Sequence, residues 1–369
     1  MSSFPRSALA GLGRHPARLS TVLVVIIGIL LPFWVDAYWL STLVFVLVAA
    51  LGALGLDVLT GRTGQISLGH AFFLMVGAYT GGYLGVNLHE SALFWIPAAG
   101  IVAGLLGAVA ATTAMRLRGL YLGIVTIGLV YIGQWVATNW TTVSGGSGGR
   151  TLAVPGNGTF SFANGLHLGS LSITENGLYY YTAFVLLALG MMYVHNLGHS
   201  RVGRNMAAVR DRELAAAVLG VNVARTKTTA FIVSSIMAGV AGAMYGSFLS
   251  FVTPGQFDLL LSIQYVIIVV VGGLGALWGP LLGAFFVVGL PALLQNEAAS
   301  LPFLEGGTRT TGIPVTDATD LLYGVLLIVF LLVEPRGIVG LAHRIGSLVR
   351  RRRATPKELG VVPSLTQEG

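Results

Sequence analysis

The chain has no cysteine and very few charged residues, and each shortage excludes a class of protein. Its 369 residues include 21 Lys and Arg and 14 Asp and Glu, together only 9% of the chain. Soluble domains carry roughly 25% charged residues, so this chain has too few ionised groups to cover a water-exposed surface. The absence of cysteine excludes disulfides and cysteine-based metal or redox chemistry.

Hydrophobic residues make up 54% of the chain, and the mean hydropathy is +0.81. A helix that crosses the hydrocarbon core needs about 20 apolar residues. Ten stretches reach or approach that length, at roughly 19–35, 39–59, 64–87, 92–114, 120–140, 177–197, 228–252, 258–275, 280–296 and 319–334. The expected fold is all-α, a polytopic membrane helix bundle of about ten transmembrane helices, some of them broken or short.

Lys and Arg gather in alternate connections between these stretches, which predicts the orientation because cytoplasmic loops carry an excess of both residues. With a cytoplasmic N-terminus, most basic residues fall inside and most acidic residues outside, with Arg150 and Arg309 as exceptions. An even number of spans with both termini in the cytoplasm is consistent with this pattern.

The same pattern divides the chain into three parts. We expect a cytoplasmic N-terminus over 1–18, a transmembrane permease domain over 19–334, and a basic cytoplasmic tail over 335–369. The largest cytoplasmic loop lies at about 198–227. The outer loop at 141–176 is rich in Gly, Ser and Asn and is a candidate lip over an entrance.

Both ends of the chain have a second interpretation. Basic residues precede the first run, as in a signal peptide, but "LLPFWVDAYWL" offers no small-residue cleavage site and another span follows at once. An uncleaved first span is therefore favoured. The tail "VRRRRATPK" could suggest nucleic-acid binding, but beside a membrane span such a tail is more often an anchor to anionic headgroups. No nucleic-acid partner is expected.

The first stretch of interest, "TGQISLGHAFFLMVGAYTGGYL", is both polar and rich in glycine. Glycines spaced by four or eight residues share one helix face and let a neighbouring backbone approach closely. The glycines that follow this spacing are Gly69, Gly77, Gly81 and Gly85. Tight helix packing is the favoured interpretation of this face.

Three polar side chains at the start of this stretch are harder to explain: Gln65, Ser67 and His70. Polar groups at membrane depth are tolerated only when protein buries them or when they face a water-filled cavity. They either bond to neighbouring helices near the interface or line a transport pathway. With the two glycines beside them, the pathway or hinge candidates here are Gly64, Gln65, Ser67, Gly69 and His70.

A proton relay through His70 is disfavoured, because no intramembrane carboxylate stands near it in the sequence. Asp57 lies near the cytoplasmic end of its span. We expect it to pair with Arg62.

The second stretch, "VVVGGLGALWGPLLGAFFVVGLP", breaks an apolar run with glycines and a proline that lacks an amide hydrogen. A tight cytoplasmic hairpin is the favoured interpretation, and a discontinuous helix that exposes backbone groups to a cargo is the alternative. The candidates here are Gly272, Gly273, Gly275, Gly279 and Pro280. The two glycine-rich stretches resemble each other loosely, which hints at an internal repeat.

The third and most informative stretch is "GRNMAAVRDRELAAAVLGVNVARTKTTAF", in the largest cytoplasmic loop. Asp211 suits a helix N-cap, Glu213 suits the first turn, and Gly220 suits the position just past the end. We therefore expect a short capped helix from Arg212 to Leu219. It could lie flat on the inner leaflet. Its alternating charges and alanines, with no large apolar stripe, favour docking into a groove on another protein.

These three stretches together resemble the permease subunits of high-affinity branched-chain amino acid ABC importers, more narrowly the longer of their two permeases. The resemblance covers roughly residues 40–340 and includes the last span, "LLYGVLLIVFLLVEPRGIVG". It implies a transmembrane permease subunit of an ATP-driven importer of branched-chain amino acids. The implied location is the bacterial plasma (inner) membrane.

The resemblance also implies partners: a second homologous permease, two cytoplasmic ATPase subunits and an extracytoplasmic solute-binding protein. The loop around Glu213 takes the place of the family's coupling loop, although Leu214 interrupts the Glu-Ala-Ala signature. The residues implied to couple to the ATPase are Arg210, Asp211, Arg212, Glu213, Ala215, Ala216 and Gly220.

ATP and Mg are expected in the partner subunits, because this chain has no GxxxxGK[ST] phosphate loop. We expect no cofactor, no metal site and no catalytic residue in this chain. An importer of urea, short amides or another small solute stays open as an alternative. A stand-alone secondary transporter or channel is the rival of a different class, but the cores of these spans carry almost none of the charged coupling residues such proteins usually use.

Overall fold

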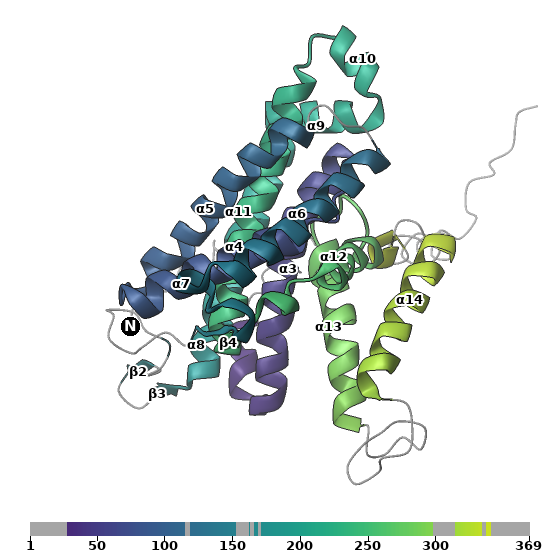
Figure 1. The fold of residues 1–369 in the computed structure, drawn as a ribbon. Coiled ribbons are helices and arrows are strands. Elements are labelled where there is room, and N and C mark those ends of the chain that lie inside the picture. Colours follow the sequence, from purple (N-terminus) through teal and green to yellow (C-terminus); the bar gives the residue numbers. More distant parts are fainter. Residues whose placement is uncertain are drawn as a thin grey trace, which may run out of the picture.

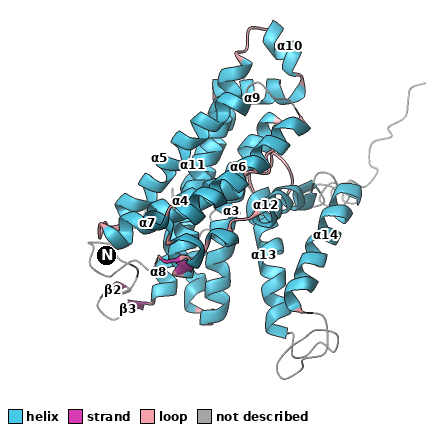
Figure 2. Ribbon diagram, in the orientation of Figure 1, coloured by secondary structure: helices cyan, strands magenta, loops and turns pink. Residues whose placement is uncertain are grey.

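The computed structural model describes residues 28–114, 119–152, 162, 166–168, 171–297, 314–333 and 337–340. The described chain is a bundle of helices with four very short strands (Figures 1 and 2), which confirms the expected all-α class. The predictions for 1–18, for Arg309, for most of 19–35 and for most of 335–369 lie outside the described residues.

Seven described helices are long and apolar enough to cross a membrane. Six of them are α3 (Ala37–Thr63), α5 (Ala92–Ala114), α6 (Leu120–Asn139), α8 (Glu175–His199), α11 (Val223–Leu249) and α13 (Gly279–Glu297). The seventh is α12 (Leu259–Gly272), with the 3₁₀ turn Pro254–Gln256 that leads into it. The expected count of ten spans is not confirmed.

The remaining helices are shorter or stand apart from these seven. They are α4 (His70–Gly82) with a π-helical turn (Tyr83–Asn87), α7 (Thr141–Ser144), α9 (Arg201–Asp211), α10 (Glu213–Val218), α14 (Val315–Val333) and the 3₁₀ turns Leu31–Phe33 and Gly146–Gly148. Strand β1 (Arg150–Thr151) pairs antiparallel with β4 (Phe251–Val252), and β2 (Leu166–Leu168) pairs with β3 (Leu171–Ile173).

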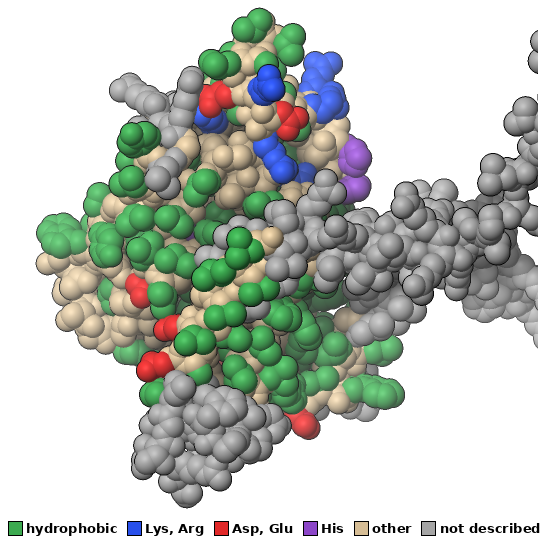
Figure 3. Space-filling view, turned by 90° about the vertical axis from the view of Figure 1, so that its right-hand side faces the viewer, with side chains coloured by type: hydrophobic (Ala, Val, Ile, Leu, Met, Phe, Trp, Pro, Cys, Tyr) green, Lys and Arg blue, Asp and Glu red, His purple; other side chains and the backbone are tan. Residues whose placement is uncertain are grey.

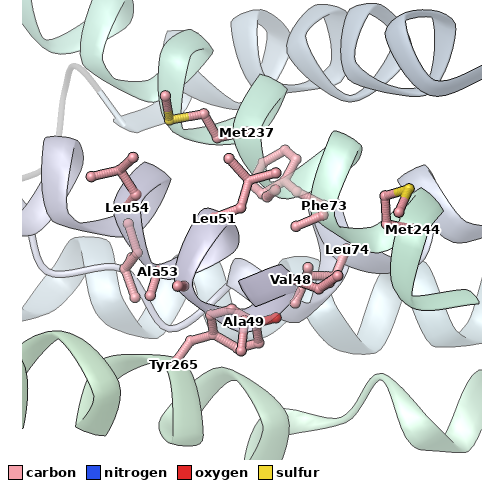
Figure 4. Close-up of a cluster of buried hydrophobic side chains, with 14 of the residues drawn as sticks. Val48, Ala49, Leu51, Ala53, Leu54, Phe73, Leu74, Met237, Met244 and Tyr265 are labelled. Atoms are coloured by element: carbon pink, nitrogen blue, oxygen red, sulfur yellow. The ribbon is translucent and has the colours of Figure 1, made fainter. Parts of the chain in front are cut away.

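Helix α3 is the central element and is buried along most of its length, because α8, α11, α12 and α13 all pack against it. Figure 4 shows its side chains Val48 and Leu51 beside Phe73 of α4, Met237 of α11 and Tyr265 of α12. A helix that is apolar on every side belongs in the interior. Four spans, α8, α11, α12 and α13, therefore surround α3, while α5 packs on α4 and α11 and α6 packs on α4.

Helices α4 and α11 touch through glycine, as the four-residue spacing predicts. A Cβ added at Gly77 would lie 2.0 Å from the carbonyl oxygen of Gly239, and one at Gly242 would lie 2.0 Å from that of Leu74. A Cβ at Gly81 would lie 2.9 Å from the Ala243 Cβ. Only residues without a side chain permit this approach, so the prediction of close packing is confirmed at Gly77 and Gly81.

The two ends of the bundle differ in charge. On the face shown in Figure 3, Lys and Arg gather at the end where α9 and α10 lie, and a broad hydrophobic band follows below them. At the opposite end the loop after α7 turns inward. Its Leu152 is fully buried between Gly82 of α4 and Gly246 of α11, and Phe162 stacks on Tyr179 with ring centroids 4.0 Å apart. Side chains from the loop thus fill this end.

Candidate functional site

Helices α9 and α10 project from one end of the bundle (Figure 1). The prediction of Asp211 as the N-cap of a helix from Arg212 is wrong, because Asp211 is the last residue of α9. Arg212 separates the two helices, with an extended backbone at φ −154° and ψ 102°. Helix α9 continues this far because Met206 and Val209 are buried against the bundle.

The end of α10 follows the prediction at Gly220. This glycine has φ +83°, the left-handed conformation that L side chains rarely adopt. Its N–H donates to the Ala217 carbonyl, and the N–H of Val221 donates to the Ala216 carbonyl, both at 3.0 Å. This is a Schellman motif, which satisfies two carbonyls at the helix end and turns the chain back toward α11.

The surface of α10 differs from the expected compact, weakly apolar one. Leu214, Val218 and Leu219 are 70%, 87% and 82% exposed. Leu214 and Val218 are four residues apart and therefore share one helix face. The prediction was of no large apolar stripe, and these three residues, here called the α10 tip, form a small exposed apolar cluster at the end of the molecule. Ala215 is exposed as well, while Ala216 is buried.

Glu213 ties α10 to the membrane-spanning part of the chain. Its Oε1 accepts from Lys227 Nζ on α11 at 3.0 Å, and Lys227 is almost fully buried. A polar cavity of about 190 Å³ opens beside this pair, and Gln65, Gly64 and Arg210 also line it. The structure thus brings together two of the residues implied to couple to the ATPase, Arg210 and Glu213, and two of the pathway or hinge candidates, Gly64 and Gln65.

The first set of pathway or hinge candidates lies between α3 and α4, on the stretch of residues 64–69, which forms no helix. The last candidate of this set, His70, is the first residue of α4. This stretch runs back into the bundle. The Tyr265 ring lies against Gly52, near the middle of α3, and its centroid is 4.9 Å from that of His70. Helix α4 therefore begins well inside the bundle rather than at its end.

Neighbouring helices satisfy the exposed backbone groups of this stretch. The N–H of Leu68 donates to Thr126 Oγ1 of α6 at 2.9 Å, and that of Ala71 donates to Ser262 Oγ of α12 at 3.0 Å. Such non-helical backbone at membrane depth persists only where protein or a water-filled cavity surrounds it. Helix α4 is thus preceded, inside the bundle, by a non-helical segment, and its first turn is surrounded by protein.

Gln65, Ser67 and His70 are all buried inside protein, at 5%, 2% and 2% exposure. Gln65 Nε2 donates to Thr63 Oγ1 at 3.1 Å, and Ser67 Oγ accepts from the N–H of Gly69 at 3.4 Å. Gln65 Oε1 and His70 Nε2 have no hydrogen-bond partner in the described part of the chain. A Cβ at Gly69 would lie 2.7 Å from the Thr126 carbonyl oxygen, so Gly69 permits the close approach of α6.

The second glycine-rich stretch forms the tight hairpin between α12 and α13. Gly273 and Gly275 have φ +114° and +79°. A Cβ at Gly272 would lie 1.9 Å from the Gly279 carbonyl oxygen, so the two helix ends touch directly. Pro280 is the second residue of α13, where a missing N–H costs nothing.

The hairpin is held to α3 by an interaction that differs from the expected ion pair. Asp57 Oδ1 accepts from the N–H of Gly275 at 2.7 Å. Arg62 instead donates to the Val194 carbonyl of α8 at 3.0 Å. Asp57 and Arg62, both in the described part of the chain, thus form no direct ion pair, although their charges still attract each other. Side chains five residues apart lie on different faces of a helix, and each finds its hydrogen-bond partner on another element.

Arg210 connects three of the singled-out segments. Its Cα lies 3.6 Å from a Cβ built at Gly64, and its guanidinium Nη1 lies 3.0 Å from one built at Gly275. Ser67, Gly69 and His70 lie deeper and are not part of this cluster. The sequence reading did not single out Lys227, Thr126, Ser262 or the α10 tip. Two features of the sequence could have identified these residues. Lys227, Thr126 and Ser262 are polar residues within or beside apolar runs, and Leu214 and Val218 of the α10 tip are spaced by four residues.

Comparison with known proteins gives a consistent answer over most of the chain. Residues 38–331 match the family model for the permease component of branched-chain amino acid transport systems. The high-affinity branched-chain amino acid transport system permease protein LivM of Escherichia coli K12 is 30% identical over 308 residues, which cover 79% of this chain and 71% of the relative.

More distant relatives match as well. The permease protein LivH of the high-affinity branched-chain amino acid transport system of Salmonella typhimurium is 25% identical over 308 residues, which cover 79% of this chain and 91% of the relative. The autoinducer 2 import system permease protein LsrC of Enterobacter sp. 638 is 34% identical over 115 residues, which cover 30% of this chain and 33% of the relative. No solved structure matches.

Proposed function

This chain belongs to the family of permease components of branched-chain amino acid transport systems, and on that premise we propose that it imports branched-chain amino acids as the membrane subunit of an ATP-driven ABC importer. The observation that carries the proposal is the α10 tip. An exposed apolar cluster on a rigid short helix, next to basic residues, is the kind of surface that a protein partner covers. We assign this partner as an ATPase subunit.

The proposed orientation places α9 and α10 in the cytoplasm. On the face shown in Figure 3 the Lys and Arg side chains gather at that end, and Lys and Arg predominate in cytoplasmic loops. Seven apolar helices and permease relatives make the chain a multi-pass protein of the bacterial inner membrane. Both termini are assigned to the cytoplasm.

Movement of α10 would reach the transmembrane helices by two routes. One is the Glu213–Lys227 ion pair, which joins α10 to α11. The other is Arg210, which lies against Gly64 at the start of the hinge and against Gly275 in the α12–α13 hairpin. Packed interfaces convert small displacements into discrete shifts of whole elements. We assign the stroke to these contacts, with Gly64 and the hairpin glycines as hinges.

We assign the remaining parts of the transporter from the family resemblance. A second, homologous permease would complete the pathway, and a solute-binding protein would deliver the cargo on the outer side. Two ATPase subunits would bind ATP and Mg and supply the energy, leaving this chain without chemistry of its own.

The cargo is the least constrained part of the proposal. The similarity to an autoinducer 2 import permease covers 30% of this chain, so part of the architecture also serves another solute. An importer of urea, short amides or a similar small solute is the second candidate. The described spans carry few charges at membrane depth, which favours a cargo selected mainly by the solute-binding protein.

Purification and reconstitution test the proposal. The tagged chain, extracted from its native membrane, should bring with it a second permease and an ATPase. The complex in proteoliposomes with its solute-binding protein should take up labelled leucine, isoleucine or valine only when ATP is present on the α10 side. Uptake of urea or acetamide in their place would favour the second candidate. Concentrative uptake by the chain alone would overturn the ABC importer.

The α10 tip supplies the sharper test. Leu214→Gln with Val218→Gln should abolish co-purification of the ATPase and ATP-driven uptake, while the amount of inserted chain stays unchanged. Ala207→Gln, on the exposed surface of α9, is the matched control and should leave both intact. An ATPase that binds the tip variant as well as it binds the unmodified chain would show that the partner docks elsewhere.

A further inference from the structure

A basic cavity lies where α9 leaves α8 and α11 begins. Its volume is about 690 Å³, and the residues that line it include Arg201, Asn205, Asn222, Arg225 and Thr229. No Asp or Glu is among the described residues that line it. Two guanidinium groups together with side-chain amides form a set of hydrogen-bond donors suited to an oxygen-rich anion such as phosphate. The Thr226 and Thr229 hydroxyls instead donate to backbone carbonyls four residues earlier in the chain.

An apolar groove lies on the same side of the molecule, further from the α10 end along α8 and α11. Its volume is about 320 Å³, and its walls come from α8, α11 and Leu51 of α3. Leu189 and Tyr193 of α8 and Ile236 of α11 line it while being 52%, 49% and 38% exposed. The groove exists because α8 packs mainly on α3 and α11 packs on α3, α4 and α5, while α8 and α11 pack little on each other.

The basic cavity and the groove are continuous along one face of α11. Arg225, Thr226 and Thr229 line the cavity, and the groove continues with Val233, Ile236, Met237 and Val240. At 3.6 residues per turn these positions fall within about one third of the helix circumference.

The depths also fit one ligand. Arg201 comes two residues after the end of span α8, and Arg225 lies in the first turn of span α11, so both stand at the membrane surface. The groove begins at Val233, about 12 Å further along α11, and extends about 10 Å more to Val240. One leaflet of hydrocarbon is about 15 Å thick, half of the full core.

We propose that this face binds one anionic phospholipid, with its phosphate headgroup between Arg201 and Arg225 and an acyl chain in the groove between α8 and α11. The charge complementarity selects an anionic lipid, and the apolar continuation selects a lipid over a free anion. A transmembrane protein partner fits less well, because a helix would not fill a polar cavity that opens at the membrane surface. The inference depends on the membrane spans and does not depend on which cargo is imported.

The site has a consequence for the loop above it. Leu219, Gly220 and Val221, the end of α10 and its connection to α11, also line the basic cavity. A headgroup in the cavity would therefore contact the segment that fixes the position of α10 relative to α11. Anionic lipid would hold the α10 tip in one orientation.

Native mass spectrometry of the full-length chain in neutral detergent tests the binding. Dioleoylphosphatidylglycerol should be retained at one copy per chain, and dioleoylphosphatidylcholine should not. Arg201→Gln with Arg225→Gln should weaken phosphatidylglycerol binding roughly fivefold per arginine, about twenty-five-fold for the pair. Arg204→Gln with Arg212→Gln removes the same charge from exposed positions that do not line the cavity and should leave binding within about twofold.

A second pair of variants tests the groove. Leu189→Trp fills it and should release the lipid, whereas Met192→Trp, on an exposed part of α8 outside the groove, should not. Melting temperatures of both variants identify a folding defect. Equal loss in the two arginine pairs, equal retention of both lipids, or displacement by inorganic phosphate at matched ionic strength would each overturn the proposal. So would a folded Leu189→Trp variant that keeps the lipid.

Discussion

At the residue scale, the helix contacts are set by glycines whose missing side chains let backbones meet. Gly77 on α4 and Gly128 on α6 show the contrast. A Cβ at Gly77 would clash with the Gly239 carbonyl oxygen at 2.0 Å, whereas one at Gly128 would meet nothing within 4 Å. The same substitution should therefore have opposite effects at the two positions.

We expect Gly77→Ala to lower stability by about 1–3 kcal/mol, as overpacking of a tight interface does. Gly128→Ala should be neutral or raise stability by up to about 1 kcal/mol, because Ala is the better helix former. Thermal unfolding of the two variants in the same detergent measures the difference. Equal melting temperatures would show that α4 and α11 are further apart than described.

Asp57 provides a second prediction at this scale. Its Oδ1 is the partner of the partly buried N–H of Gly275. Asp57→Ala should lower stability by about 1–3 kcal/mol, because the N–H is left without a partner. Asp57→Asn keeps a carbonyl oxygen at that position and should lose less. If Ala and Asn melt at the same temperature, the hydrogen bond does not hold the hairpin.

At the element scale, α10 behaves as a separate lever with two attachments. The Schellman turn at Gly220 fixes its far end, and the Glu213–Lys227 pair fixes its near end to α11. Because Lys227 is almost fully buried, this pair should be worth more than an exposed one, for which up to about 1 kcal/mol is typical.

Lys227→Met should reduce ATP-driven uptake more than it reduces ATP hydrolysis by the assembled complex, since the lever loses its attachment to the span. A double-mutant cycle with Glu213→Gln should give a coupling energy of about 1 kcal/mol or more. Uptake and hydrolysis that fall in parallel would point to a general assembly defect instead.

At the scale of the whole molecule, the charge asymmetry and the absence of cysteine together make the orientation measurable. Single cysteines can be introduced into the unmodified background, because it contains none. Arg212→Cys lies at the α9–α10 end, and Glu90→Cys lies between the π-helical turn and α5, at the opposite end.

A membrane-impermeant maleimide should label Glu90→Cys from outside intact spheroplasts and Arg212→Cys only in inverted vesicles. The reason is that the basic end is retained in the cytoplasm. Labelling of Arg212→Cys from outside would reverse the orientation and exclude docking of a cytoplasmic ATPase at the α10 tip.

Much of this arrangement was predictable from the sequence, because hydropathy runs and turn residues act locally. The all-α class, the short helix before Gly220 and the hairpin around Gly275 belong to this group. The bond between Asp57 and Gly275, the Glu213–Lys227 pair and the depth at which α4 begins join distant segments. A single sequence contains no record of such pairings. The start of α10 was misplaced because buried Met206 and Val209 extend α9 beyond the point that capping chemistry alone would choose.

The depth at which α4 begins also sets a length requirement on the chain. From Thr63 back down to the level of Gly52 is about 16 Å at 1.5 Å per residue, and the seven steps from Thr63 to His70 reach at most about 24 Å. The connecting segment therefore uses about two thirds of its reach, and removal of two residues would leave a reach of at most about 18 Å, barely more than the distance to be covered. Unlike an ordinary surface loop, this segment should tolerate neither the loss of two residues nor the slack of an added pair, which would let α4 slip out of register with the glycines of α11.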